Sequence, residues 1–89
     1  MSTRLHVLVH GTVHGVGFRR AAERAARQAG VGGYVRNRPD GTLEAALEGE
    51  PAAVDRVLEL LRTGPPGAHV TDVEVEEVPR RDERSFTVR

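Results

Sequence analysis

The chain has 89 residues, carries 13 basic and 13 acidic side chains, and contains no cysteine, which excludes disulfides, thiolate nucleophiles and cysteine-ligated metal sites. Its length suits one small core, so we expect residues 1–89 to form a single free-standing domain. The balanced charge and the small number of aromatic residues, three, argue against nucleic-acid binding. The apolar runs are short and predict neither a membrane span nor a secretion signal, so we expect a cytoplasmic location.

The first half of the chain predicts a strand, a helix and a hairpin. Residues 4–13 alternate between apolar and polar side chains, which is typical of a half-buried strand. Alanines recur at three- and four-residue steps between residues 18 and 29, and this spacing predicts a helix that a group of glycines ends. Two short strands, 34–37 and 42–47, are joined by an Arg-Pro-Asp-Gly turn and predict a hairpin.

The second half predicts a helix and two further strands. The helix opens at Gly49-Glu50-Pro51, carries an apolar stripe and ends at a Gly-Pro-Pro-Gly turn. Valines alternate with acidic residues over 70–78, and a final short strand covers 85–88. The order βαββαβ plus a terminal strand predicts an α+β protein, a ferredoxin-like sandwich with two helices on one face of a mainly antiparallel sheet.

A glycine-rich loop lies where the first strand gives way to the first helix. Three glycines fall within residues 11–17, so main-chain N–H groups are exposed just ahead of a helix N-terminus. Such amides form a cradle for an anion, with phosphate as the natural ligand. The alternative is an ordinary strand-to-helix turn.

Two arginines at the helix start favour the anion hypothesis. Arg19 and Arg20 face the positive end of the helix dipole, at a cost of about 0.3–1 kcal/mol, so a negative charge is expected nearby. Glu23 could supply it from one turn further on, and two solvated arginines are the simplest alternative.

The segment from Val9 to Arg19, Val-His-Gly-Thr-Val-His-Gly-Val-Gly-Phe-Arg, resembles the phosphate-loop signature of acylphosphatases. A second segment, Gly33-Tyr34-Val35-Arg36-Asn37, is similar to that family's other signature, and the resemblance extends over essentially the full chain. The sequence departs from the family pattern at His14, where glutamine is usual, and at Leu43, where valine is usual.

The resemblance implies an enzyme that hydrolyses the carboxyl–phosphate bond of a small acyl phosphate, without metal or other cofactor. It implies that Arg19 binds the phosphate and that Asn37 positions the attacking water. Inorganic phosphate is the expected product and inhibitor, and a monomer is the expected working form. The implied phosphate-binding residues are His14, Gly15, Val16, Gly17, Phe18 and Arg19.

The topology supports the pairing of Arg19 with Asn37. In the predicted fold, strands one and two run parallel with one strand between them, so their carboxyl ends lie at the same edge of the sheet. Taken alone, Asn37 could equally be a turn residue that bonds its own backbone.

Two questions stay open at the level of the sequence. His14 could brace the loop, add positive charge beside a bound anion, or turn to solvent. Together with His6 and His10 it also suggests a metal cluster, but the spacing of the three histidines supports such a cluster only weakly. The same loop would also suit a binding module that senses a small anion, and turnover distinguishes that module from an enzyme.

Overall fold

The computed structural model describes all 89 residues and contains five strands and two helices. They are β1 (Thr3–Thr12), α1 (Phe18–Ala29), β2 (Gly32–Asn37), β3 (Leu43–Gly49), α2 (Pro51–Thr63), β4 (His69–Glu77) and β5 (Phe86–Val88). This order confirms the predicted βαββαβ arrangement with a terminal strand.

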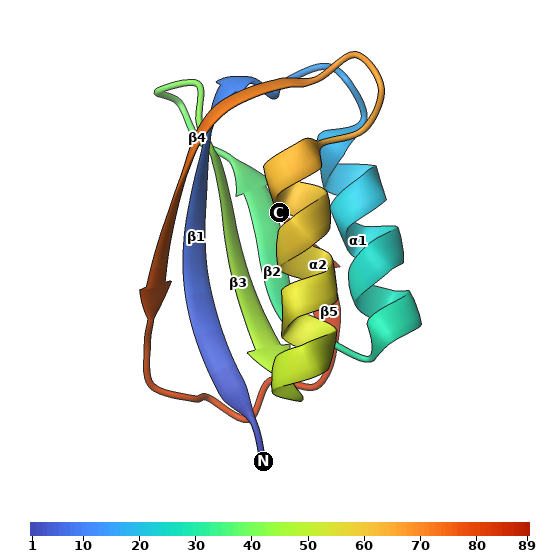
Figure 1. Ribbon diagram of the computed structural model, residues 1–89, viewed down its shortest axis with the longest axis vertical. Coiled ribbons are helices and arrows are strands. Elements are labelled where there is room, and N and C mark those ends of the chain that lie inside the picture. Colours follow the sequence, from blue (N-terminus) through green and yellow to red (C-terminus); the bar gives the residue numbers. More distant parts are fainter.

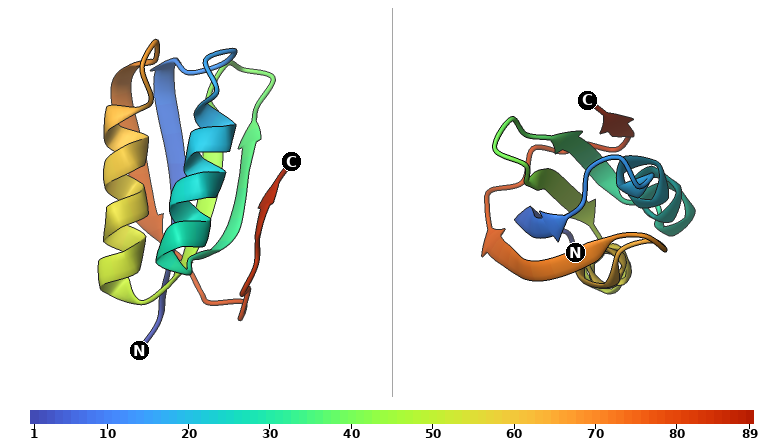
Figure 2. Two further views of the ribbon diagram at one scale, coloured as in Figure 1. Left: turned by 90° about the vertical axis from the view of Figure 1, so that its right-hand side faces the viewer. Right: turned by 90° about the horizontal axis from the view of Figure 1, so that it is seen from above.

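The strands form one sheet in the order β4-β1-β3-β2-β5. β1 and β2 both pair antiparallel with β3, so they run parallel to each other with β3 between them, as predicted. β5 is the exception in the sheet because it runs parallel to β2 along its outer edge. Figures 1 and 2 show both helices on one face of the sheet.

Small and branched apolar side chains fill the space between the helices and the sheet. The alanine stripe of α1 buries Ala22 and Ala26, whose small side chains let the helix lie close to the strands. The buried core residues of α2 are Ala53, Val54, Val57 and Leu61. Neither helix is long and apolar enough to cross a membrane.

One predicted strand boundary is wrong for a steric reason. The sequence predicts that Gly32 and Gly33 end the first helix outside any strand, but both belong to β2. Gly33 has φ +126°, and a Cβ there would lie 1.9 Å from the carbonyl oxygen of Ala46 on β3. Glycine therefore permits the close approach of β2 and β3 and does not act here as a helix stop.

Candidate active site

The loop between β1 and α1 presents free main-chain amides. Gly15 and Gly17 adopt φ values of +72° and +77°, which other residues rarely adopt, and Gly17 precedes α1 without any side-chain cap. No main-chain amide between residues 14 and 20 donates a hydrogen bond to another main-chain group. These donors and the positive end of the helix dipole form an anion-binding cradle.

A hollow of about 350 Å³ opens beside this loop. Five predicted site residues line it: Gly15, Gly17, Phe18, Arg19 and Asn37. Four further residues line it: Val13, Arg20, Glu23 and Val88. The sequence had already suggested Arg20 as an anion partner and Glu23 as its counter-charge, whereas Val13 and Val88 were not expected there. The loop, the end of β2 and the end of β5 therefore meet at this hollow.

Asn37 is the last residue of β2, and its side chain lines the hollow. Its Oδ1 atom is buried and accepts no hydrogen bond within the protein. A buried acceptor of this kind is costly unless a bound molecule donates to it. The unpaired Oδ1 therefore suits a donor that enters the hollow, such as water.

The turn after β2 is held by Asp40, which removes the need for Asn37 as a turn residue. One carboxylate oxygen of Asp40 accepts from the amide of Thr42 at 3.0 Å and from its hydroxyl at 2.6 Å. Those two hydrogen bonds from Thr42 hold the pKa of the Asp40 carboxyl below its ordinary value. The hairpin is closed without the Asn37 side chain.

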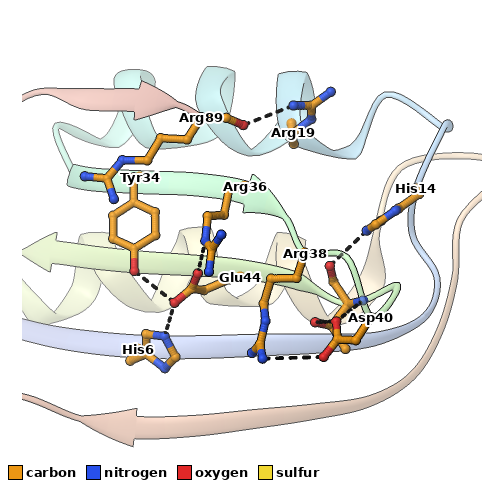
Figure 3. Close-up of polar contacts among 10 residues, drawn as sticks. His6, His14, Arg19, Tyr34, Arg36, Arg38, Asp40, Glu44 and Arg89 are labelled. Atoms are coloured by element: carbon orange, nitrogen blue, oxygen red, sulfur yellow. Dashed lines mark hydrogen bonds and ion pairs between the residues drawn. The ribbon is translucent and has the colours of Figure 1, made fainter.

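Arg19 and Arg20 both line the hollow, but their surroundings differ. The Nη1 atom of Arg19 donates to the main-chain oxygen of Arg89, the last residue of the sequence, at 3.1 Å (Figure 3). Arg20 is exposed and has no ion-pair partner. Glu23, the acid expected to compensate these arginines, pairs instead with Arg27 at 3.0 Å. No acidic side chain pairs with Arg19 or Arg20, so both can attract an anion from outside the protein.

His14 braces the loop against the hairpin. Its Nε2 atom lies 2.9 Å from the main-chain carbonyl oxygen of Thr42, and the side chain does not line the hollow (Figure 3). The side chain of Val16 also lies outside the hollow lining, so a contribution from residue 16 would come from its main-chain amide. Of the arrangements considered for His14, the structure has the one in which the side chain braces the loop, and the side chain does not turn to solvent.

The three histidines near the N-terminus have separate partners. His6 contacts Glu44 at 2.6 Å, His10 contacts Glu74 at 2.5 Å, and His14 contacts Thr42. His10 lies close enough to Asp72 and Glu74 to share an ion with them, but none of these residues lines the hollow. The structure therefore does not bring the three histidines together.

Fold and site together define a class of protein: an α+β sandwich with a glycine-rich anion cradle, an arginine and an asparagine around one hollow. The family model for acylphosphatases matches residues 5–88. An acylphosphatase of Bordetella parapertussis is 51% identical over 82 residues, which cover 92% of this chain and 80% of that protein. An acylphosphatase of Thermococcus kodakarensis is 51% identical over 72 residues, covering 81% of this chain and 79% of that one.

Solved structures agree with the sequence comparison. An acylphosphatase from Coxiella burnetii superimposes with a TM-score of 0.94 at 36% identity, over 99% of this chain and 93% of that one. An acylphosphatase from Bacillus subtilis gives a TM-score of 0.91 at 32% identity, over 99% and 98% of the two chains. The chain belongs to the acylphosphatase family.

Proposed function

We propose that this protein hydrolyses the carboxyl–phosphate bond of small acyl phosphates and releases a carboxylate and inorganic phosphate. The observation that carries the proposal is the shared hollow: free loop amides, the Arg19 guanidinium and the unpaired Asn37 Oδ1 atom all belong to it. One chain supplies every residue of the hollow, which supports a monomer as the working form.

The loop and Arg19 bind the phosphoryl group. Main-chain N–H groups of residues 15–20 donate to its oxygens, and the planar guanidinium of Arg19 donates to two of them at once. Negative charge moves onto the phosphoryl and leaving-group oxygens as the bond breaks. Hydrogen-bond donors that are already in position stabilise this charge and lower the barrier to hydrolysis.

Asn37 positions the water. Its Oδ1 atom accepts a hydrogen bond from a water that lies in line with the bond to be broken. The water oxygen bonds to phosphorus, the bond from phosphorus to the acyl oxygen breaks, and its electron pair leaves with the carboxylate. One water proton passes to a phosphoryl oxygen. A carboxylate leaves readily without an acid, so the site requires alignment and charge stabilisation more than a strong base.

The side chains that line the hollow are poor metal ligands, which argues for hydrolysis without a metal. Two arginines line it, and its one carboxylate, Glu23, already pairs with Arg27. Divalent cations prefer clusters of oxygen or imidazole ligands, which this hollow does not offer.

Hydrolysis of acetyl phosphate and benzoyl phosphate in excess chelator tests the proposal. We expect turnover well above the spontaneous rate, unchanged by chelator, with competitive inhibition by inorganic phosphate. Activity that appears only when a divalent ion is restored would contradict the metal-free mechanism. Phosphate binding without any turnover would instead support an anion-sensing module.

A further inference from the structure

A second hollow lies on the outer side of α1, next to the hollow that contains the phosphate loop. It has a volume of about 390 Å³ and is lined by Arg20, Glu23, Arg24, Arg27 and Gln28, and we call it the helix hollow. Arg20 and Glu23 also line the first hollow, so the two hollows meet at these residues. A group attached to a phosphate in the first hollow can therefore extend into the helix hollow.

The helix hollow carries an excess of positive charge. Three of its lining residues are arginines and one is a carboxylate, Glu23, which pairs with Arg27 at 3.0 Å. The side chains of Arg20 and Arg24 are exposed and take part in no ion pair and no hydrogen bond within the protein. Two positive charges are therefore left without a counter-charge beside the site.

The spacing of the two unpaired arginines favours an anion between them. Arg20 and Arg24 are four residues apart, which places them on the same side of α1, about 6 Å apart along the helix axis. Like charges at this spacing destabilise a helix, and α1 has no acidic residue in its first turn to relieve the repulsion. A negative charge that contacts both guanidinium groups would remove this cost.

The proposed mechanism directs the acyl group of the substrate toward this side of the molecule. Asn37 reaches the first hollow from the end of β2, whereas Arg20 and Glu23 reach it from α1. In-line attack places the water and the acyl oxygen on opposite sides of phosphorus. With the water beside Asn37, the acyl group points away from β2, and the helix hollow is the adjoining surface on the α1 side.

We propose that Arg20 and Arg24 are specificity-determining residues, which favour acyl phosphates whose acyl group carries a second negative charge several bonds from the phosphorus. The inference deepens the proposed function and rests on it, because it assigns a place to the acyl group of the same substrate. The acyl group of acetyl phosphate is too short to reach Arg24, so the preference appears only with longer acyl groups.

Two synthetic substrates of the same shape isolate the effect of this charge. In 4-carboxybenzoyl phosphate a rigid ring carries a carboxylate, and in 4-carbamoylbenzoyl phosphate the same ring carries a neutral amide. Each kcat/KM, measured at low ionic strength, is divided by the spontaneous hydrolysis rate of that substrate to correct for its reactivity. The ratio of the two corrected values is the charge preference, and for the wild type we expect it to exceed about three-fold in favour of the carboxylate.

Substitutions in the helix hollow should change the charge preference in both directions. Arg24→Met should lower it about two- to five-fold, the range for loss of one exposed ion pair, and the change should lie in KM and not in kcat. Arg20→Met should lower it as well. Glu23→Gln removes the carboxylate and frees Arg27, so it should raise the charge preference.

Arg56→Met is the matched control for Arg24→Met. Arg56 is an exposed arginine of α2 with no ion pair, and it lines neither hollow. Its substitution removes the same charge from a helix and should leave the charge preference unchanged. Melting temperatures of all variants check that each one is folded at the assay temperature.

Ionic strength tests the electrostatic origin of the preference without any substitution. Salt screens exposed charges, so the charge preference of the wild type should fall as ionic strength rises from about 0.01 M to about 1 M. The preference of Arg24→Met should fall less steeply, because one of the two charges is already absent. A preference that does not depend on salt would overturn the assignment to these arginines.

The two proposals fail in different ways. A wild-type protein that hydrolyses neither benzoyl substrate nor acetyl phosphate contradicts the proposed function. A wild-type protein that hydrolyses both benzoyl substrates with a charge preference near one contradicts the specificity role alone. A charge preference that Arg24→Met and Arg56→Met lower equally would also overturn that role, because the effect would then come from the net charge of the protein.

Discussion

Arg19 and Asn37 line the same hollow but offer it different chemistry. Arg19 brings a fixed positive charge and a fork of N–H donors, whereas Asn37 brings a neutral amide with a buried, unpaired oxygen. A charge that binds phosphate stabilises the bound substrate as well as the transition state, while an atom that aligns water acts mainly on the chemical step.

Alanine substitutions separate these two roles. Arg19→Ala should weaken phosphate inhibition and lower kcat/KM together. Asn37→Ala should leave phosphate inhibition nearly unchanged and lower kcat about 10²- to 10³-fold, as is typical for loss of one preorganised polar group. Steady-state kinetics with phosphate as inhibitor measures both, with Arg20→Ala as a control that loses far less. A fully active Asn37→Ala enzyme would contradict the water-positioning role.

His14 provides a second test at the residue scale. Because its Nε2 atom is directed at the Thr42 carbonyl, 2.9 Å away, and the ring does not line the hollow, we expect the His14 side chain to contribute little to phosphate binding. The pH dependence of phosphate inhibition should therefore superimpose for wild type and His14→Gln, whose amide can donate the same hydrogen bond. A phosphate affinity that rises at low pH in wild type alone would place an imidazolium next to the anion instead.

At the scale of elements, Glu44 on β3 joins β1 and β2 across the open face of the sheet. Its carboxylate accepts hydrogen bonds from His6, Tyr34 and Arg36, which lowers its pKa from an ordinary value near 4.5 to about 2 despite the opposing effect of burial. A group whose pKa is lower in the folded state stabilises the fold above its unfolded pKa, and that contribution is lost as pH falls toward the folded pKa.

Glu44→Gln should therefore destabilise the protein by about 1–3 kcal/mol at pH 7. The difference from wild type should shrink as pH falls from about 4.5 to about 2, where the wild-type carboxyl also becomes neutral. Urea unfolding at several pH values measures it, with the exposed residue Glu59 as a Glu→Gln control. A difference that stays constant with pH would mean that the charge of Glu44 is not what stabilises the sheet.

Local patterns predicted the elements well because alternation and helical spacing are properties of neighbouring residues. Arg19 and Asn37 could also be placed together, since the topology sends β1 and β2 in the same direction. The contribution of β5 could not be predicted in this way. Arg89 reaches Arg19 across 70 positions of sequence, and the contact is made by its main-chain oxygen and not by its side chain. No side-chain pattern marks it.

The role of Gly33 escaped prediction for a related reason. Glycine before a strand usually signals a turn, and only the packed sheet reveals that the carbonyl oxygen of Ala46 lies 1.9 Å from where a Cβ atom would stand. Val13 and Val88 were likewise absent from the predicted site, because their place in the hollow follows from how the loop and β5 pack.

At the scale of the whole molecule, the groups that stabilise the far end of the sheet are separate from the hollow. Arg4 and Glu48 form a buried ion pair at 2.8 Å, and Glu83 joins Arg4 at 2.7 Å. Glu48 also accepts hydrogen bonds from the main-chain amides of Arg81 and Asp82, which fastens the segment between β4 and β5 to the sheet. None of these residues lines the hollow.

Glu48→Gln should therefore lower stability by about 3 kcal/mol, because it leaves part of a buried charge uncompensated. The kcat/KM of the folded fraction should stay within about two-fold of wild type, since the loop and its hollow are unaffected. Chemical denaturation and kinetics at a temperature where the variant is folded check the two expectations. A large loss of kcat/KM in the folded variant would show that the two ends are coupled.

The parallel pairing of β5 with β2 also has a kinetic consequence. Gly33 pairs with Phe86, so β5 can dock only after the chain has closed a loop that contains β3, α2 and β4. Closing long loops is entropically slow, whereas the helices and the β2–β3 hairpin form from near neighbours. During refolding, helical structure should therefore return first, and the ability to capture phosphate should be the last native property to emerge.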